Sequence, residues 1–204
     1  MDAAGWDDRY REAEELVWTQ GPNVFVAEIL GDRPPGRALD IAAGEGRHSI
    51  WLARLGWHVT AVDFSEVGLQ RANQWATAEG VADHLTTVVA DVVEFAPAPD
   101  YFDLALFAYL QVPEEARRAA LHHVAEAVSV GGLIVVVAHD SSNLAHGVGG
   151  PPDPAVLYSP TDLAADFETA PGTWTVELAE VRERQVAGAP RPALDAVVVA
   201  RREA

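Results

Sequence analysis

Short runs of β-branched and other apolar residues alternate along the chain with longer stretches whose apolar positions recur at helical spacing. The short runs predict five strands, at residues 37–42, 58–63, 85–91, 102–109 and 133–139. The longer stretches predict helices at residues 47–55, 67–79 and 114–130. Pro113 is placed to begin the third helix and the pair Gly131-Gly132 to end it. Regular alternation of this kind is typical of βαβ units and a largely parallel sheet.

The last third of the chain departs from the alternation. Residues 173–185 and 193–201 read as strands, and the connection between them is too short for a crossover helix, so we expect an antiparallel hairpin. The predicted fold is therefore α/β, with a seven-stranded mixed sheet whose edge is antiparallel. Ser159 is a candidate N-cap for a short helix through Phe167. Residues 141–158 form a Gly/Pro/Asn-rich loop of a length usually reserved for function, here a candidate substrate loop.

Composition narrows the functional classes. The 204 residues, 49% of them hydrophobic, suit a single domain spanning residues 1–204. All 14 basic residues are Arg, and 31 acidic residues bring the formal net charge to −17, which disfavours nucleic acid and anionic membranes as partners. The absence of Lys and Cys excludes Schiff-base lysines, thiolate nucleophiles and cysteine-ligated zinc. The acidic first residues lack the pattern of a signal peptide, so a cytoplasmic location is expected.

A glycine turn carries most of the functional inference. Gly44-Glu45-Gly46 lies between the first predicted strand and the first predicted helix, where a ligand approaches the backbone closely. Asp63 ends the second strand, in the position from which a carboxylate accepts hydrogen bonds from ribose hydroxyls. These features predict an adenosine-type ligand at the carboxyl ends of the strands.

The charges beside the turn separate the candidate ligands. A dinucleotide would place its pyrophosphate at the N-terminus of the first helix, where Asp40 and Glu45 would repel it. S-adenosylmethionine (SAM) carries an ammonium and a sulfonium and no phosphate. Both acids therefore favour SAM over a nicotinamide dinucleotide.

Residues 37–72, RALDIAAGEGRHSIWLARLGWHVTAVDFSEVGLQRA, resemble motifs I and II of class I SAM-dependent methyltransferases. The resemblance is closest to the small bacterial branch around the tellurite-resistance and thiopurine methyltransferase-like enzymes, which often open with a segment like Trp6–Tyr10. It implies a Rossmann-like sheet of strand order 3-2-1-4-5-7-6 with helices on both faces. The N-terminal stretch, residues 1–30, reads as helical with a break near Gly21-Pro22, and the resemblance places it as a cap over the active site. A cofactor-binding core is expected over 37–140 and a terminal hairpin over 173–201.

The resemblance also assigns site residues. It implies that SAM, and the product S-adenosylhomocysteine, contact the turns after the first four strands, at Asp40, Ala42, Gly44, Glu45, Gly46, Asp63, Phe64, Ser65, Asp91, Val92 and Phe107. Ala42 stands where the family commonly has a glycine. An Asp that ends a strand, like Asp91, is also a common turn former or helix cap. Residues 107–113 lack the Asn/Asp-Pro-Pro-Tyr sequence of enzymes that methylate the amino groups of nucleic acids or protein glutamine.

Three polar residues at strand ends are candidates for the chemistry. Tyr109, His139 and Asp140 are candidate general bases or substrate anchors, in falling order of expected proximity to the methyl group, or else they solvate loops. The spacing of His139, Asp140 and His146 matches no metal motif, so no metal is expected. Trp6, Tyr10 and Trp18 belong either to the core or to the lining of a pocket.

These observations predict a methyltransferase that acts on a small-molecule acceptor by in-line displacement, with an O, N, S or chalcogen nucleophile. Two alternatives stay open, a non-catalytic SAM-binding regulatory protein and an NAD(P)-dependent oxidoreductase. The sequence does not choose between a monomer and a homodimer, and it leaves the acceptor unidentified.

Overall fold

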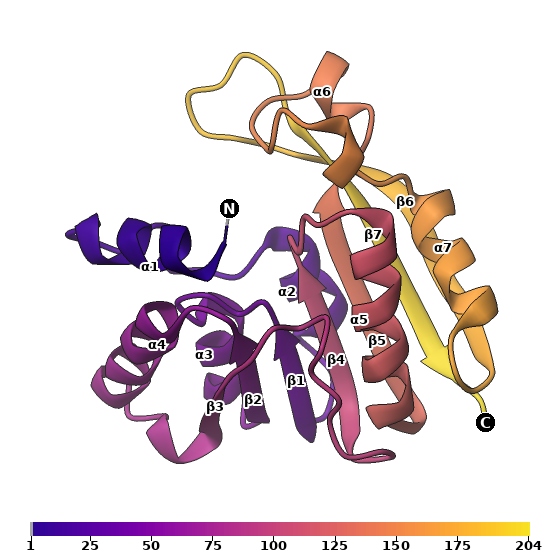
Figure 1. The fold of residues 1–204 in the computed structure, drawn as a ribbon, viewed down its shortest axis with the longest axis horizontal. Coiled ribbons are helices and arrows are strands. Elements are labelled where there is room, and N and C mark those ends of the chain that lie inside the picture. The colour runs from indigo at the N-terminus through magenta and orange to yellow at the C-terminus, as the bar shows by residue number, and fades with distance from the viewer. Residues whose placement is uncertain (1) are drawn as a thin grey trace. The chain divides into compact units, whose positions relative to one another are not determined.

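The computed structural model describes residues 2–204, and the chain divides into two compact units, residues 1–95 and 96–204. The sheet has seven strands in the order β3-β2-β1-β4-β5-β7-β6 (Figure 1). Strand β7 runs antiparallel to β5 and β6. The predicted α/β fold class, its strand order and its antiparallel last strand are confirmed. That residues 1–204 make one domain stays a prediction.

The first unit is a parallel three-stranded segment with its connecting helices. Its strands are β1 (Arg37–Ile41), β2 (His58–Asp63) and β3 (Leu85–Val89). Its helices are α1 (Ala3–Glu12), α2 (Val24–Leu30), α3 (Arg47–Arg54) and α4 (Glu66–Ala78), with a 3-10 turn at Ala82–His84. Both β1 and β3 pair with β2 in parallel. This arrangement brings the carboxyl ends of β1 and β2 to the same edge.

Local chemistry explains where the two connecting helices begin. Helix α4 starts after Ser65, whose hydroxyl oxygen accepts the N–H of Gly68 at 3.0 Å. Helix α3 starts after Gly46, whose left-handed backbone (φ 77°) turns the chain sharply out of β1. Ile50 and Leu52 of α3 are fully buried. Both helices therefore begin at the edge where β1 and β2 end.

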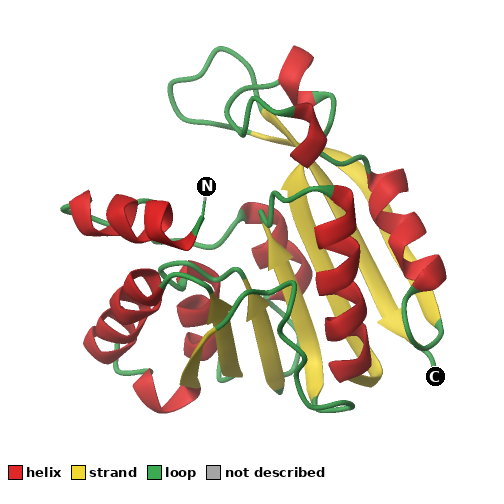
Figure 2. Cartoon of the chain, in the orientation of Figure 1, coloured by secondary structure: helices red, strands yellow, loops and turns green. Residues whose placement is uncertain are grey.

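The second unit contains two parallel strands followed by a hairpin. Its strands are β4 (Phe102–Ala108), β5 (Val128–His139), β6 (Trp174–Arg184) and β7 (Ala193–Arg202). Its helices are α5 (Glu114–Ala127), α6 (Asn143–His146) and α7 (Pro160–Thr169), with a 3-10 turn at Pro154–Val156. Strands β6 and β7 form the predicted antiparallel hairpin. Helices α5 and α7 run in front of the strands in Figure 2, and Ser159 caps α7 as predicted.

The third predicted helix is shorter than expected. It ends at Ala127 instead of residue 130, and β5 begins at Val128, so Gly131-Gly132 lie inside the strand. Val128 pairs with Phe102, and the register then shifts before Leu104 pairs with Leu133. Gly131 has a left-handed backbone (φ 82°), and a Cβ on Gly132 would lie 3.0 Å from the carbonyl oxygen of Asp103. Strand pairing therefore overrides helical propensity here, and the glycines allow the bulge.

The N-terminal segment, residues 2–30, contains less helix than the sequence predicted. Helix α1 ends at Glu12, and the chain stays non-helical until α2 begins at Val24, so the break is far wider than Gly21-Pro22. No helix within residues 2–204 has the length and apolar character needed to cross a bilayer.

Candidate functional site

The turn after β1 has an unusual backbone. Ala42, Gly44 and Gly46 all have φ between 56° and 77°, in the left-handed region. Glycine adopts this region freely, whereas a residue with a Cβ is strained there by roughly 1–2 kcal/mol. Ala42 therefore holds a strained conformation in the position where the resemblance called for glycine. Because Gly44 and Gly46 have no side chains, neighbouring groups approach the backbone of the turn closely.

Asp63, at the end of β2, locks this turn in place. Its Oδ2 accepts the N–H of Gly44 at 2.8 Å, and its Oδ1 accepts the N–H of Ser65 at 2.8 Å. Asp63 is 5% exposed. Burial raises its pKa, although the two N–H donors act in the opposite direction. The spacing of 19 residues between Gly44 and Asp63 thus has a structural cause, since the carboxylate joins the ends of two neighbouring strands.

Asp40, on β1, is a buried carboxyl group whose close hydrogen-bond partner is a neutral side chain. It is 1% exposed, and the hydroxyl of Ser49 donates to its Oδ2 at 2.6 Å. Burial raises the pKa of Asp40 to about 7, although Ser49 and the charge of Arg47 favour the ionised form. A cation beside the carboxylate would offset that burial. The site therefore suits a positively charged ligand better than a phosphate.

Glu45 has a different role in the structure. It is 2% exposed, and its Oε1 lies 2.8 Å from the Nε of Arg71. Its Oε2 accepts the N–H of Val17 at 2.8 Å. Burial raises its pKa more than these contacts lower it. Because both oxygens contact groups of the same chain, a contact between Glu45 and a cofactor stays a prediction.

The N-terminal segment is fastened to α4 and to the glycine turn. Arg71, on α4, donates from Nη1 to the carbonyl oxygens of Tyr10 and Ala13, each at 2.8 Å, and from Nη2 to that of Glu15 at 2.5 Å. Asp7, on α1, accepts the hydroxyl hydrogen of Ser65 at 2.6 Å. Sequence reasoning missed this use of Arg71. Its carbonyl partners also explain why the helix stops early, because those carbonyls bind a guanidinium instead of continuing the helical ladder.

Tyr10 covers the glycine turn. A Cβ on Gly44 would lie 2.6 Å from the Tyr10 hydroxyl oxygen, and a Cβ on Gly68 would lie 3.0 Å from its ring. Tyr10 is 4% exposed, and its ring centroid lies 5.5 Å from that of Trp6. Trp18 is 42% exposed and belongs to a segment, residues 15–20, that borders a hollow of about 460 Å³. The segment thus combines a buried anchor with an exposed aromatic side chain.

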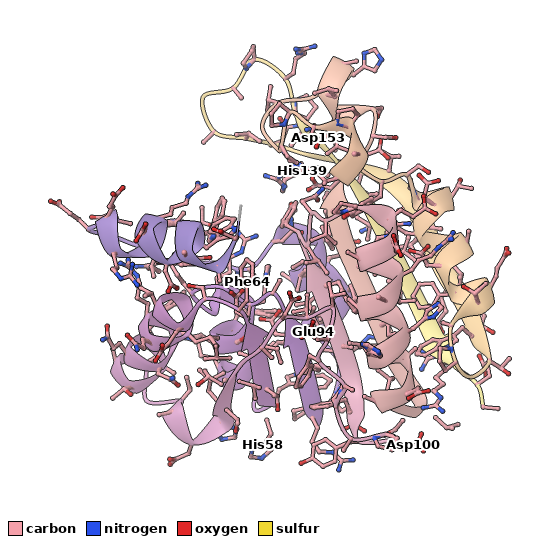
Figure 3. The ribbon with its side chains drawn as sticks, viewed as in Figure 1. His58, Phe64, Glu94, Asp100, His139 and Asp153 are labelled. Carbon is pink, nitrogen blue, oxygen red and sulfur yellow. The ribbon has the colours of Figure 1, made fainter. Side chains whose placement is uncertain are left out.

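The other predicted cofactor residues have varied surroundings. Phe64 lies at the end of β2 (Figure 3), and Ser65 is fully buried. Asp91 is exposed, and its Oδ1 accepts the N–H of Val93 at 2.9 Å, which is the alternative turn-forming role. Val92 is 9% exposed. Their contacts with a cofactor stay predictions.

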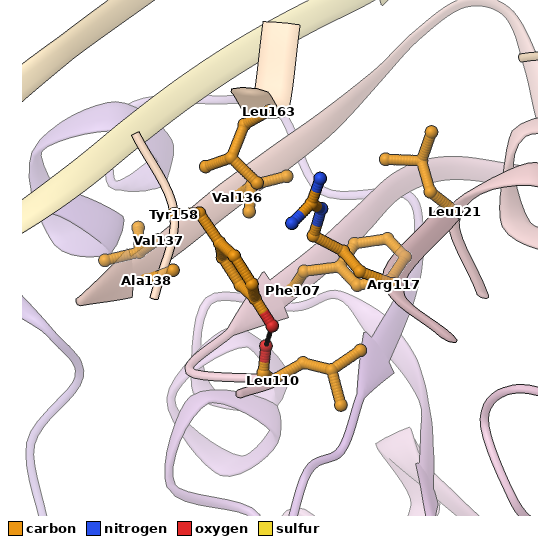
Figure 4. A pocket seen from close by; sticks show the side chains of 9 residues that line it. All are labelled: Phe107, Leu110, Arg117, Leu121, Val136, Val137, Ala138, Tyr158 and Leu163. Carbon is orange, nitrogen blue, oxygen red and sulfur yellow. Dashed lines mark hydrogen bonds between the residues drawn. The ribbon is translucent and has the colours of Figure 1, made fainter. Parts of the chain in front are cut away.

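Phe107 lines a small apolar cavity within the second unit (Figure 4). The cavity measures about 10 Å³, the size of about one water probe, and is too small for a substrate. Arg117 and Tyr158 also border it, and the hydroxyl of Tyr158 donates to the carbonyl oxygen of Leu110 at 3.0 Å. Phe107 is 3% exposed, so its ring packs in the core, and its role beside the cofactor stays a prediction.

A second polar group, which we call the Asp195 cluster, consists of Tyr109, His139, Arg184 and Asp195. Asp195 on β7 is fully buried. It accepts the Tyr109 hydroxyl hydrogen at 2.7 Å and an N–H from Arg184 Nε at 2.7 Å, and its Oδ1 lies 3.4 Å from His139 Nδ1. Tyr109 has a left-handed backbone (φ 65°). The structure thus brings together two of the three predicted catalytic residues, with two partners that sequence reasoning missed.

The predicted substrate loop, residues 141–158, folds over His139 (Figure 3). A Cβ on Gly150 would lie 2.9 Å from the His139 ring. Gln111 accepts the His139 N–H at 2.9 Å and donates its amide hydrogen to the carbonyl oxygen of Val156. Asn143 donates to the carbonyl oxygen of Gly149 at 2.9 Å. The side chains of Gln111, outside the loop, and of Asn143, within it, therefore hold the loop beside the Asp195 cluster.

Asp140 begins that loop. It is 3% exposed, and its Oδ1 accepts the N–H of Ser142 at 2.8 Å as well as the hydroxyl hydrogen of Ser142. Its buried Oδ2 has no hydrogen-bond partner among the described residues. Asp140 thus forms a turn and keeps one carboxylate oxygen unused. Within residues 2–204 no group of three or more His, Asp or Glu side chains is arranged to hold a metal ion.

Comparison with known proteins relates part of the chain to a known family. Residues 38–132 match the family model described as "Methyltransferase domain". Glycine N-methyltransferase of Rattus norvegicus is 30% identical over 185 residues, covering 80% of this chain and 58% of the relative. The chain thus spans a little over half the length of that relative. A structure of TehB from Haemophilus influenzae superposes with a TM-score of 0.68 at 19% identity, covering 97% of this chain and 67% of that one.

A solved structure concerned with the conversion of a disulfide bond into a thioacetal group during echinomycin biosynthesis superposes with a TM-score of 0.77. The identity is 22%, with 98% of this chain and 91% of that chain covered. At such identities the likeness shows the shared fold, and the family model adds the methyltransferase domain. Residues 38–132 thus match a methyltransferase domain, and the chain resembles the class I SAM-dependent methyltransferases, in particular the branch that contains TehB.

Proposed function

We propose that this protein transfers the methyl group of SAM to a small-molecule acceptor. The observation that carries the proposal is the glycine turn locked by Asp63, with the buried carboxyl group of Asp40 on the same strand end. The glycines of the turn offer backbone without side chains, Asp63 suits ribose hydroxyls, and Asp40 suits a cation. A dinucleotide shares the ribose but brings a pyrophosphate, which these carboxylates would repel.

The residues of the first unit would bind and orient the cofactor. SAM, when bound, supplies an electrophilic methyl group on a sulfonium. Each Asp63 oxygen accepts one backbone N–H and keeps a further lone pair for a ribose hydroxyl. Asp40 would lower the energy of a bound positive charge. The N-terminal segment, with Tyr10 over the turn, would exclude water from the bound cofactor.

The Asp195 cluster and Asp140 supply candidates for handling the acceptor. An acceptor that must lose a proton needs a base, and His139, Tyr109 and Asp140 are the available groups. The nucleophile is an O, N, S or chalcogen atom. The name of the relative glycine N-methyltransferase supports including small amines among the acceptors to be tested.

Ligand-induced stabilisation tests the cofactor assignment. A ligand that binds only the folded state raises the melting temperature, so we expect SAM and S-adenosylhomocysteine to do so and NAD and NADP not to. Asp63→Ala should weaken SAM binding by at least about tenfold, because the ribose hydroxyls lose their acceptor. Asp83→Ala, an exposed acid in the same unit, is the matched control and should change nothing. Stabilisation by NAD or NADP alone would favour the oxidoreductase alternative.

A methyl-transfer screen separates the enzyme from the regulatory alternative. Glycine, small thiols, phenols, selenite and tellurite are incubated with methyl-labelled SAM, and S-adenosylhomocysteine is quantified. We expect turnover with at least one of these acceptor classes. SAM binding without turnover on any of them would favour the non-catalytic regulatory protein.

A further inference from the structure

We propose that Asp195 is a positioning residue for acceptor deprotonation: it holds the Nδ1–H tautomer of His139, so that His139 Nε2 is the base. Tyr109 and Arg184 hold Asp195 in turn. The inference deepens the proposed function and rests on it for the identity of the reaction. It narrows the three candidate bases to one and adds two residues on the terminal hairpin that have no role in the sequence prediction.

The geometry gives Asp195 three neighbours from three other strands or strand ends. Tyr109 follows β4, His139 ends β5 and Arg184 ends β6. The hydroxyl of Tyr109 and the Nε of Arg184 both donate to Oδ2, each at 2.7 Å. Oδ1 accepts a second, longer N–H from Arg184 Nη2 at 3.4 Å and lies at the same distance from His139 Nδ1.

His139 Nδ1 is buried and has no closer hydrogen-bond partner among the described residues. A separation of 3.4 Å is long for a hydrogen bond, but catalytic hydrogen bonds are often long before substrate binds. Among the described residues, Asp195 has the only carboxylate within ion-pair distance of this nitrogen. A neutral His with Nδ1–H directed at Asp195 has its lone pair on Nε2, where a base needs it.

The charges around Asp195 keep it ionised. Burial alone would raise its pKa, but hydrogen bonds from His139, Arg184 and Tyr109 together hold that pKa below the usual value. Arg184 is the one permanent cation in the cluster, and its guanidinium carbon lies 5.6 Å from the centre of the Tyr109 ring. Asp140, the residue after His139, is a further acid on the same strand end. An ionised Asp195 both selects the tautomer and stabilises the imidazolium formed when His139 accepts a proton.

The methyl transfer needs no reactant other than SAM and the acceptor. The nucleophilic atom of the acceptor forms a bond to the methyl carbon while the methyl–sulfur bond breaks and its electron pair stays on sulfur. His139 Nε2 takes the proton that the nucleophile loses, and the resulting imidazolium keeps its Nδ1–H on Asp195. The proton then passes to solvent, so that the products are the methylated acceptor, S-adenosylhomocysteine and a proton.

A tautomer measurement tests the positioning directly. Long-range ¹H–¹⁵N correlation spectra distinguish Nδ1–H from Nε2–H histidine, and His139→Gln identifies which signals belong to His139. In the unmodified protein at neutral pH we expect the Nδ1–H form, which is the minor form of free histidine. An Nε2–H tautomer would overturn the proposal, and this result needs no variant of Asp195.

The variant Asp195→Asn tests whether the charge of Asp195 fixes the tautomer of His139. It keeps the shape of the side chain but removes the charge, so we expect His139 to lose its fixed tautomer. With an acceptor identified by the screen, kcat should fall by about 100-fold while SAM affinity is retained. The acid limb of the pH–rate profile should move to lower pH, because the imidazolium loses its counter-charge. A fall in kcat with an unmoved acid limb would reduce Asp195 to a structural role.

Glu177→Gln is the matched control. Glu177 lies on the same hairpin and pairs with Arg201 at 2.5 Å. Its substitution removes one paired carboxylate, as Asp195→Asn does, but away from the cluster. Neither the His139 tautomer nor the pH–rate profile should change. If the Nδ1–H tautomer is present but no acceptor in the screen is methylated, the proposed function fails while the assigned hydrogen bond stands.

Discussion

Three buried carboxyl groups lie at the glycine turn of the first unit, and they differ in how their charge is balanced. Glu45 has Arg71, and Asp63 has two backbone N–H donors. Asp40 has Ser49 as its close hydrogen-bond partner, which explains why burial takes its pKa to about 7. Asp40 is therefore the residue whose ionisation should respond most strongly to a bound cation.

This imbalance predicts a pH-dependent affinity for SAM. A cation beside Asp40 favours its ionised form, so binding lowers the pKa of Asp40 and releases a proton. Affinity should therefore rise with pH, by up to about tenfold per pH unit between about pH 5 and pH 7, and level off above the free-state pKa. Without ligand, the same raised pKa makes the folded state lose stability as pH rises through that window.

Isothermal titration calorimetry in buffers of different ionisation enthalpy measures the proton release. Asp40→Asn should remove most of the pH dependence and bind SAM with nearly constant affinity. Proton uptake on binding, or a wild-type affinity that is flat from pH 5 to pH 7, would contradict a cation beside Asp40.

The sequence identified some site residues and missed others for a clear physical reason. Gly44, Asp63 and Asp40 lie within one βαβ unit, whose geometry relates spacing to position. Asp195 lies 86 residues after Tyr109, so only the sheet brings them together. One signal was available, since Asp195 is a charged residue inside the otherwise apolar stretch from residue 193 to residue 200 of β7. A buried strand position occupied by an acid indicates a partner.

At the scale of elements, a buried ion pair ties α5 to α7. Asp166 on α7 is fully buried, and Arg117 on α5 donates to it from Nε at 2.6 Å and from Nη2 at 3.1 Å. Arg118 adds a third hydrogen bond at 2.8 Å from a half-exposed position. The pair fixes the distance between the two helices. Removing Asp166 would leave the buried guanidinium of Arg117 without its ionic partner.

Asp166→Ala should therefore lower the free energy of unfolding by about 3–5 kcal/mol, the cost of leaving a buried charge without its partner. Urea denaturation followed by circular dichroism measures the change, with an unaltered m-value as the sign of a folded variant. Arg118→Gln is the control. It should have little effect because Arg118 is half exposed and Asp166 keeps both hydrogen bonds from Arg117. Equal losses in both variants would contradict the importance of burial.

Element boundaries were predictable where local chemistry decides them and wrong where distant contacts do. The Ser159 cap of α7 and the start of α5 after Pro113 follow from neighbouring residues alone. The end of α5 depends on Val128 pairing with Phe102, and the end of α1 depends on Arg71, which lies about sixty residues away. Propensity could not anticipate either contact.

At the scale of the whole molecule, the charge is strongly unbalanced. The formal net charge of −17 on 204 residues comes from 31 acids and only 14 arginines. Repulsion among surface carboxylates destabilises the compact state, because unfolding moves like charges apart.

Salt should therefore stabilise the folded protein. Raising NaCl from low concentration to about 0.5 M shortens the Debye length well below the ~10 Å it has at 0.1 M and screens the repulsion. We expect the melting temperature at pH 7 to rise by a few degrees, since about 1 kcal/mol corresponds to roughly 2–4 °C for a chain of this size. Near the isoelectric point of about 4.6 the net charge vanishes, and the salt effect should largely vanish with it. A rise of equal size at both pH values would mean that salt acts through apolar burial instead, because that contribution does not depend on net charge.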